Sequence, residues 1–477
     1  MAQIGVDLGS YVFNAATGTI TFVGVSITSI EQIKPIVNGT RQTVIFNPAE
    51  SGKFGVLSNN VLTLDFNTTS YSNSDKLYIC VNNLKKQDFN KDAFGRTRVS
   101  EQNPLLDAQF TYGLQPLVFE QIATGTGATV THDATNRCAL MTFASTGANG
   151  NAMMQSFNFF RYQAGKSQEI FISFNFIESI AGVRKIAGYS SGLNGIEFNS
   201  INGVHSLRIL NGGTEGGEEV IQSNWNLNTY NSLDISKTQL MVIDFQALYV
   251  GLVRVGFEWK GQIIYVHQFE HANNFAYPYL QSANLPVRCG MIRESGTVST
   301  TMRFICATVS SEGGVLEQAG LNNITPLVGV TASNGARTHV LSVRPRTTFN
   351  GITNRTRLYS LSVEVNDTGN SPVEWELCIG QAITGASYSN VNTNHSAFEY
   401  SSAGTLSGTP TIQIDGGLVL AAGKSLKGTT TSNTDIRIPI TLDAAGNVRA
   451  NGTLTLVVKG LGGNSACYCN MQWQEIY

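Results

Sequence analysis

Charge is the first property that this sequence has little of. Only 13% of its 477 residues are charged, which is about half of what soluble domains usually carry. The 31 Lys and Arg residues nearly balance the 33 Asp and Glu residues, so the formal net charge is −2 at pH 7. Such a chain has no bulk electrostatic attraction to nucleic acid or to anionic lipid. We therefore expect neither a nucleic-acid partner nor insertion into a membrane.

Long hydrophobic runs are missing as well. No apolar run approaches the ~18 residues of a transmembrane helix. The stretch "MAQIGVDLGSYVFNAATG" has neither a basic nor an apolar region, so we expect no signal peptide. The seven cysteines are scattered without CxxC spacing, which favours reduced thiols in a chain made in a cytoplasm. Cys467 and Cys469 would share one face of a strand, but no second ligand pair suggests a metal.

A helical hydrophobic stripe is the third absence, and strand patterns take its place. Apolar and polar residues alternate in short runs such as "EIFISFNF" and "GTLTLVVKG", and Gly-, Asn- and Ser-rich turns separate these runs. The sequence therefore predicts an all-β protein, in which a small N-terminal β domain is followed by two β-sandwich or jelly-roll domains.

Changes in composition along the chain predict the domain boundaries. Residues 1–84 form the small β-sandwich module. Residues 85–104, the most charged and least apolar stretch, read as a linker or arm that packs against neighbouring parts of an assembly. Residues 105–314 form a jelly-roll or lectin-like sandwich, and residues 315–477 form the second sandwich.

One hairpin can be predicted down to its register. In "GLVRVGFEWKGQIIYVHQFE" the pair Lys260-Gly261 can serve as a two-residue turn. The pairing then places Ile264 opposite Phe257 and Val266 opposite Val255, on one apolar face. In this register His267 lies beside Arg254 on the other face, as a solvated or interface histidine.

Two motifs resemble nucleotide or ester chemistry but lack its structural context. "AGKS" occurs at 164–167 and 422–425, yet Phe160 and Leu418 stand where a phosphate-binding loop needs its first glycine. The first copy also continues as a strand, whereas a phosphate loop opens a helix. "GYSSG" at 188–192 matches G-x-S-x-G, but it too leads into a strand instead of a helix. We therefore expect no bound nucleotide, no cofactor and no serine nucleophile.

Metal and carboxylate chemistry have equally little support. On one strand His267 and His271 would lie ~13 Å apart, too far to share an ion, so we expect no metal site. Glutamates gather in the Gly-rich stretch "GGTEGGEEV" as Glu215, Glu218 and Glu219. We expect a solvated loop there that could carry recognition.

Whole phrases of the sequence resemble structural proteins of tailed-bacteriophage virions. The clearest is "DAFGRTRVSEQNPLLDAQFTYGLQPLVFEQ" at 92–121, which is similar to an "FGRxRVS" segment of that family. "FRYQAGKSQEI", "ANLPVR", "ICATVSSEGG", "ITNRTRLYSLSVEV" and the ending "QWQEIY" resemble further blocks of it. The first module, with "VIFNP" and "SNSDKLYICV", looks like a small β domain found at the front of phage virion proteins.

The resemblance implies a non-enzymatic virion component, assembled in the host cytoplasm, with no catalytic residue and no cofactor. Its N-terminal module 1–84 would attach to other virion proteins of the capsid, neck or tail, and its sandwiches would be displayed on the particle surface, with a homo-oligomer expected. We predict that Phe94, Arg96 and Arg98 of the arm contact such partners, because a guanidinium fork suits bidentate pairing. The alternative for the two arginines is simple solvation.

Two other functions remain open at this stage. One is a tail-fibre or tailspike-like protein that binds a receptor or a host surface glycan through loops such as Asn211–Glu219. The other is a capsid decoration protein. A glycan-degrading enzyme ranks below both, because it needs two carboxyl groups ~5–9 Å apart across a cleft, and the sequence does not place its glutamates on one face.

Overall fold

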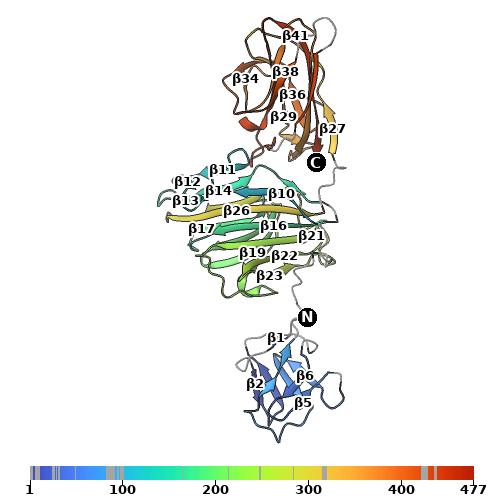
Figure 1. The fold of residues 1–477 in the computed structure, drawn as a ribbon. Coiled ribbons are helices and arrows are strands. Elements are labelled where there is room, and N and C mark those ends of the chain that lie inside the picture. The colour runs from blue at the N-terminus through green and yellow to red at the C-terminus, as the bar shows by residue number, and fades with distance from the viewer. Residues whose placement is uncertain are drawn as a thin grey trace. The chain divides into compact units, whose positions relative to one another are not determined.

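The computed structural model describes most of the chain and bears out an all-β fold. The residues it describes are 4–5, 11–23, 27, 30, 33–48, 50–81, 92–93, 96, 101–163, 165–212, 214–246, 249–282, 284–313, 320–419, 428–434 and 438–476. Among these residues no helix exceeds three residues, and none is long and apolar enough to cross a membrane. Figure 1 shows strands in every part of the chain.

The chain divides into two units, Met1–Asp88 and Phe89–Tyr477. The first unit is the small β domain that the sequence predicts. Its core is formed by apolar residues that alternate along short strands, such as Phe13, Ile20 and Phe46. Its four-stranded sheet has the order β2 (Tyr11–Asn14), β3 (Thr19–Phe22), β7 (Val61–Leu64), β6 (Gly55–Ser58). Its other strands are β5 (Thr43–Phe46), β4 (Ile36–Asn38) and β8 (Leu77–Tyr78), and the pair β1 (Ile4–Gly5) and β9 (Cys80–Val81).

The second unit holds both large sandwiches, of which the central one is built from two broad antiparallel sheets. The strands of the eight-stranded sheet lie side by side in Figure 1. Its order is β12 (Ala128–Asp133), β13 (Cys138–Phe143), β26 (Thr300–Glu312), β16 (Ser167–Asn175), β21 (Gln239–Gln246), β22 (Val253–Trp259), β23 (Gln262–Phe269), with β10 (Gln102–Gln109) also on β26. The seven-stranded sheet has the order β11 (Phe119–Thr124), β14 (Gly150–Ser156), β25 (Val287–Arg293), β17 (Val183–Ser190), β18 (Gly195–Ile201), β19 (Val204–Asn211), β20 (Thr214–Ile221).

Strict alternation decides which face of each sheet is buried. In β16 the residues Ile170, Ile172 and Phe174 lie in the core between the sheets, as their spacing predicts. The core is rich in aromatic rings, and Phe176 and Phe198 stack across it with ring centroids 5.4 Å apart. Two minor elements complete this sandwich: the pair β15 (Phe160–Arg161) and β24 (Asn284–Leu285), and the 3₁₀ turn η2 (Gln222–Asn224).

The predicted hairpin forms, but its register is only half right. β22 and β23 turn at Lys260 and Gly261, with φ of 52° and 79°, and Ile264 pairs with Phe257 as expected. A β-bulge then shifts the pairing, so that Val255 faces His267 instead of Val266 and Arg254 faces Gln268. The prediction for His267 was therefore wrong. This side chain is buried, and its Nδ1 accepts the Asn226 N–H at 3.1 Å.

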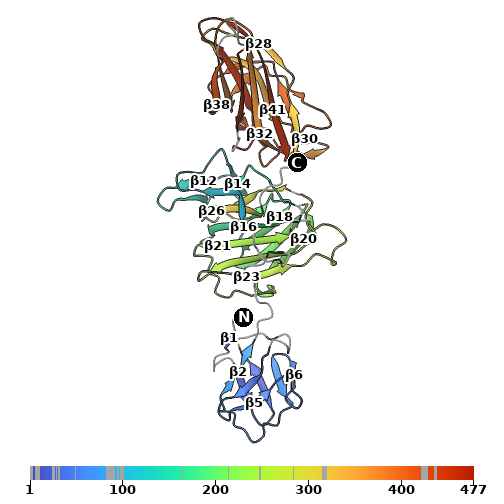
Figure 2. The ribbon, with the colours of Figure 1, turned by 45° about the vertical axis from the view of Figure 1, so that its right-hand side comes forward.

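The C-terminal sandwich also consists of two sheets (Figure 2). One has the order β27 (Gly320–Ile324), β41 (Ser465–Ile476), β32 (Arg357–Asp367), β39 (Gly428–Thr434), with β28 (Val328–Ala332) also on β41. The other has the order β35 (Ser389–Asn390), β36 (Phe398–Ser401), β29 (Thr338–Pro345), β40 (Leu454–Gly460), β33 (Val373–Ile379), β38 (Ile412–Val419). Smaller elements are the hairpins β30 (Thr348–Phe349) with β31 (Ile352–Thr353) and β34 (Ala382–Thr384) with β37 (Thr405–Ser407), and the 3₁₀ turn η4 (Ala450–Gly452).

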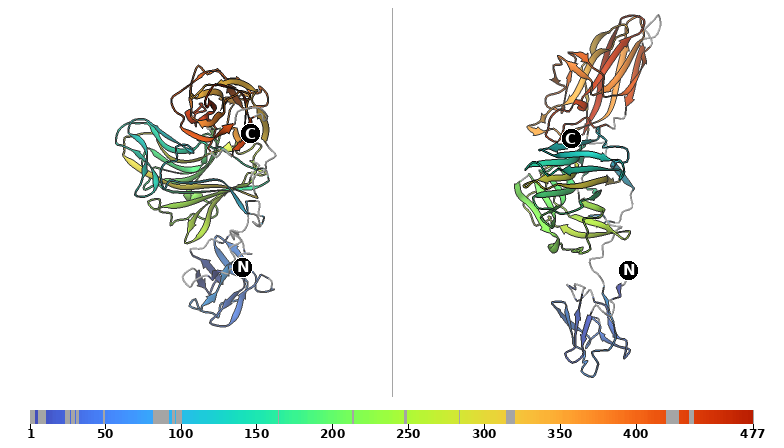
Figure 3. Two further views of the ribbon diagram at one scale, coloured as in Figure 1. Left: turned by 45° about the horizontal axis from the view of Figure 1, so that its top comes forward. Right: turned by 90° about the vertical axis from the view of Figure 1, so that its left-hand side faces the viewer.

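Arginine–phenylalanine contacts join the two sandwiches of the second unit. Three arginines of the C-terminal sandwich lie over rings of the central one, with Cζ-to-centroid distances of 4.1, 5.8 and 3.5 Å: Arg355 on Phe159, Arg357 on Phe160, and Arg449 on Phe157. The Thr441 hydroxyl also donates to the Phe157 carbonyl at 3.0 Å. A desolvated cation–π contact contributes about 2 kcal/mol, so these contacts hold the sandwiches together. Figure 3 shows both sandwiches from two further sides.

Candidate functional site

Six polar side chains and one glycine form a row across the outer face of the seven-stranded sheet. The register aligns one residue from each of the seven strands: Glu120, Gln155, Arg288, Gly188, Glu197, Arg208 and Glu219. Their sequence neighbours, such as Met154, Phe198 and Leu207, lie in the core. Because side chains alternate across a sheet, the row faces away from that core. We call these seven residues the polar row.

The centre of the polar row is an ion pair between Glu197 and Arg208. The Arg208 Nη2 and Nε lie 2.8 and 3.0 Å from one carboxylate oxygen, Glu197 Oε2. The Glu197 side chain is only 1% exposed, and its other oxygen, Oε1, has no hydrogen-bond partner among the described residues. A buried carboxylate oxygen without a donor is costly. The ion pair therefore leaves one buried acceptor at the centre of the row without a donor among the described residues.

Glycines on and beside the row shape the space next to this ion pair. Gly188 lies between Arg288 and Glu197 in the register, and a Cβ on Gly188 would lie 2.9 Å from Glu197 Cγ. A Cβ on Gly192 would collide with the Arg288 guanidinium, so the turn after β17 packs closely on that side chain. Burial lowers the pKa of Arg288, and the negative charges of Glu197 and Glu120 partly oppose this.

The β20 end of the row is a hydrogen-bonded carboxylate. Ser206 and Asn199 both donate to Glu219 Oε1, the latter at 3.2 Å. Partial burial alone would raise the pKa of Glu219, but these hydrogen bonds and the charges of Arg208 and Arg184 lower it below its ordinary value. Glu219 is thus held ionised.

The β11 end of the row meets the C-terminal sandwich. The Ala444 N–H donates to Glu120 Oε2 at 2.7 Å. Burial raises the pKa of Glu120, helped by the charge of Asp443, while the Ala444 N–H and the charges of Arg449 and Arg355 oppose it. One end of the polar row is therefore bounded by the other sandwich.

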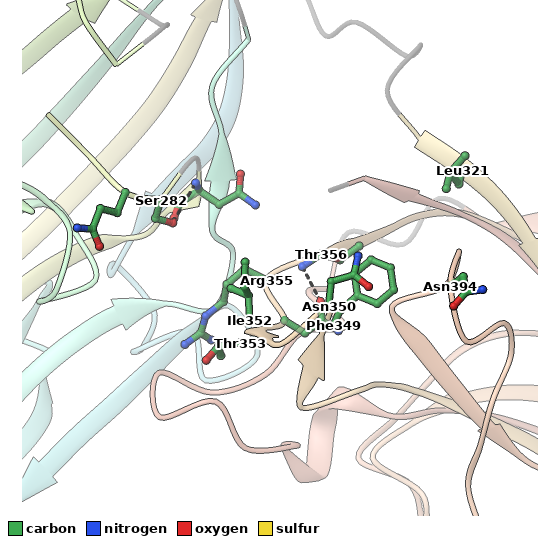
Figure 4. A pocket seen from close by; sticks show the side chains of 12 residues that line it. Ser282, Leu321, Phe349, Asn350, Ile352, Thr353, Arg355, Thr356 and Asn394 are labelled. Carbon is green, nitrogen blue, oxygen red and sulfur yellow. Dashed lines mark hydrogen bonds between the residues drawn. The ribbon is translucent and has the colours of Figure 1, made fainter. Parts of the chain in front are cut away.

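A pocket lies where the two sandwiches meet (Figure 4). Its volume is about 570 Å³, within the range of small-molecule sites. It is lined by Gln281, Ser282 and Asn284 from the central sandwich and by Leu321, Phe349, Asn350, Ile352, Thr353, Asn354, Arg355, Thr356 and Asn394 from the C-terminal one. Amides and hydroxyls dominate this lining.

The arm residues named from the sequence are only partly described. Phe94 and Arg98 lie outside the described residues. Arg96 is paired within its own chain: its Nη2 lies 2.7 Å from Asp92 Oδ2 and 3.2 Å from the Gly165 carbonyl. The described part of the arm is therefore fastened to the central sandwich, and contact with other virion proteins stays a prediction.

The glutamates of "GGTEGGEEV" do not form one cluster. All three belong to strand β20, and the side chain of Glu215 is not described. Glu218 and Glu219 point to opposite faces: Glu218 Oε2 lies 3.5 Å from His271 Nε2, whereas Glu219 belongs to the polar row. The sequence thus identified one row member without its partners, because register alone brings Glu197 and Arg208 beside it.

The motifs rejected from the sequence are turns and strand ends. In the first "AGKS" copy, Gly165 has a φ of 79° and Lys166 Nζ donates to the Gln163 side chain and to the Gly313 carbonyl. The second copy, 422–425, lies outside the described residues. "GYSSG" ends β17 and leads to β18. Across the described ranges, no three His, Cys, Asp or Glu side chains gather as metal ligands would.

Comparisons with known proteins find only distant structural likenesses. No protein-family model and no curated protein sequence matches the chain. It is similar to the solved structure of a carbohydrate esterase from the Shiga toxin-encoding bacteriophage phi24B, at 12% identity and a TM-score of 0.29 over 45% of this chain and 100% of that one. It is also similar to a pseudo β-1,3-glucanase of Mycobacterium tuberculosis, at 11% identity and a TM-score of 0.31 over 44% and 99%.

A third such structure is the legume lectin-like domain from Entamoeba histolytica, at 10% identity and a TM-score of 0.28 over 44% of this chain and 97% of that one. Likenesses this distant carry no argument about what the present chain binds. The class that its own strands define is a multi-domain β-sandwich protein.

Proposed function

We propose that the chain is a non-enzymatic structural component of a bacteriophage particle, with the polar row as a binding face for a host surface glycan. The virion role is supported by the phrases of the sequence that resemble phage structural proteins. Glycan binding is supported by one observation, the continuous polar row across the seven-stranded sheet. Attachment through the N-terminal region 1–84 and the arm completes the proposal.

The chemistry of the polar row suits a ligand rich in hydroxyl groups. A sugar hydroxyl is both donor and acceptor, so it can donate to a carboxylate and accept from a guanidinium. Hydrogen bonds to ionised groups are the strong ones. The row offers both kinds of group from Glu197, Arg208 and Arg288, fixed in position by the sheet and by their mutual contacts. Such preorganisation reduces the entropy that binding costs.

The same geometry favours binding over hydrolysis. Glu197 and Glu219 stand two strands apart, about 10 Å by strand spacing, close to the upper limit for the carboxyl pair of an inverting glycosidase. Arg208 lies between them in the register and takes the space that the attacking water would need. A general acid also needs a raised pKa, whereas that of Glu219 is lowered. The carboxyl spacing keeps an inverting hydrolase as the second candidate function, and the position of Arg208 and the lowered pKa of Glu219 rank it below glycan binding.

The test is binding of the purified protein to polysaccharides from host cell surfaces. Glu219→Gln and Arg208→Met should each weaken capture by tenfold or more. Asp107→Asn changes an exposed carboxylate on β10 of the opposite sheet and should leave capture unchanged. Release of reducing sugar by the wild type, abolished in Glu219→Gln, would instead favour the hydrolase.

The virion role is tested separately by cryo-EM of intact particles. Density that fits the described sandwiches should be found on the particle, and the number of copies distinguishes a decoration protein from a fibre. Its absence from purified particles would contradict the virion role and would leave the glycan-binding test unaffected.

A further inference from the structure

We propose that the pocket between the two sandwiches is a second binding site, specific for a short uncharged saccharide. It shares no residue with the polar row, and its binding groups belong to other strands and loops. Both sandwiches contribute to its lining. Figure 4 shows Ser282 on one side and Leu321 and Asn394 on the other, with these residues in the middle: Phe349, Asn350, Ile352, Thr353, Arg355 and Thr356.

A tight hairpin forms the middle of the pocket. The sequence "TFNGIT" places Asn350 and Gly351 at a two-residue turn between β30 and β31, with φ of 51° and 78°. Asn-Gly is the preferred pair for such a turn, because both positions need a positive φ. The turn sets Ile352 outward, where its side chain is 73% exposed.

Uncommitted amide groups supply the polar contacts. Within the described chain, the side-chain amides of Gln281, Asn350 and Asn394 take part in no hydrogen bond, and the side-chain oxygen of Asn284 has no partner either. Each amide carries a donor and an acceptor, so it can bind two neighbouring hydroxyls of a sugar ring. A ligand that supplies these bonds displaces only water.

Charge selects against an ionic ligand. Among the lining residues only Arg355 is charged. Its Nη1 and Nη2 donate to the Asp443 and Ala444 carbonyls at 2.6 and 2.9 Å, and its guanidinium covers the Phe159 ring. The negative charges of Asp443 and Glu120 already act on this guanidinium, so an acidic sugar would compete with carboxylates, and a cationic ligand would find no carboxylate in the lining.

Apolar surface lies beside these amides. Leu321 is 45% exposed and Ile352 is 73% exposed, and Phe349 also lines the pocket. The C–H faces of a sugar ring pack on such side chains, while its hydroxyls reach the amides. A mixed lining of this kind, with few convergent polar groups, is typical of small-ligand sites.

The experiment is a binding screen of the full chain against immobilised neutral and acidic oligosaccharides. Wild type should capture one or more neutral oligosaccharides, and the double variant Asn350→Ala/Asn394→Ala should lose at least tenfold in affinity for them. The matched control is Asn370→Ala, an exposed amide that follows the other end of β32 from the pocket. It should bind as wild type does.

Three outcomes would overturn the pocket proposal. These are capture of acidic oligosaccharides alone, equal loss in Asn370→Ala, or neutral binding that survives the double variant. Loss of neutral binding in Glu219→Gln, with the double variant unaffected, would assign the sugar to the polar row. Because all three asparagines are exposed, the substitutions should leave the fold intact. Thermal melting of each variant checks this.

Discussion

At the scale of single residues, this molecule buries charged groups that its sequence gives no reason to place inside. Lys185 is 0% exposed, and its Nζ donates to the Phe176 carbonyl at 2.7 Å, to Thr300 Oγ1 at 2.8 Å and to the Thr301 carbonyl at 2.9 Å. Arg293 likewise donates to four backbone carbonyls. These cations are structural, because each donates several hydrogen bonds to backbone or hydroxyl oxygens of other segments.

Lys185 should make the stability of the second unit depend on pH. Burial lowers the pKa of Lys185 to about 8, against 10.5 for a free lysine, although the charge of Glu178 opposes the shift. Between these two pKa values the unfolded chain binds more protons than the folded one, so stability rises with pH. The shift corresponds to about 3 kcal/mol.

Urea unfolding at pH 7 to 10.5 measures this contribution by comparison with Lys185→Met. The variant lacks the titrating group, so the stability of wild type relative to it should grow by up to about 3 kcal/mol across that interval. A difference that stays constant with pH would show that burial does not lower this pKa.

The candidate site shows the same limit of sequence reasoning. Glu219 could be named from its glutamate-rich stretch, but Glu197 and Arg208 could not. They sit singly in ordinary strand patterns, eleven residues apart. Only the pairing of β18 with β19 brings them together.

At the scale of elements, turns are the structures that local sequence predicts best. Lys260-Gly261 predicts a hairpin turn, and Phe257 pairs with Ile264 as this turn requires. The sequence does not predict the bulge further along the hairpin, between the pairs Gly256–Tyr265 and Val255–His267. Nothing local marks it, because Val266 is apolar and suits either register, and its burial in the core is a tertiary effect.

The turn itself offers a clean test of backbone strain. Gly261 has a φ of 79°, and a Cβ there would meet no atom within 4 Å. Gly261→Val should therefore cost about 1–2 kcal/mol through backbone conformation alone. Lys260→Asn should change stability by less than about 0.5 kcal/mol, because asparagine tolerates a positive φ. Urea midpoints followed by tryptophan fluorescence compare the two, and a neutral Gly261→Val would contradict the assigned turn.

At the scale of the whole molecule, the arginine–phenylalanine contacts join the central and C-terminal sandwiches into one unit. Arg449 lies 3.5 Å from the centroid of the Phe157 ring. Burial lowers the pKa of Arg449 to about 10, so it remains charged at neutral pH. The arginines come from "ITNRTRL" and "GNVRANG", and the phenylalanines from "SFNFF". These stretches are nearly 200 residues or more apart, and no local pattern links them.

Breaking these contacts should uncouple the two sandwiches. The double variant Arg355→Ala/Arg449→Ala removes two ring contacts of about 2 kcal/mol each, so we expect its heat-unfolding profile to separate into two transitions. Arg344→Ala is the control, because Arg344 lies over Tyr388 and pairs with Glu399 inside the C-terminal sandwich. It should lower the melting temperature without the separation. Calorimetry that finds equal separation in both variants would show that the junction contacts do not couple the sandwiches.

The sequence by itself determined the all-β fold, the small domain ahead of two sandwiches, and the turns, because alternation and turn residues are local properties. The tertiary structure alone decided the polar row, the bulge at Val266, the contacts between the two sandwiches, and the pocket. Each of these depends on which strands pair and in what register. Pairing is set by the packing of whole sheets, so residues such as Glu197 and Arg208, or Phe157 and Arg449, become partners only after folding.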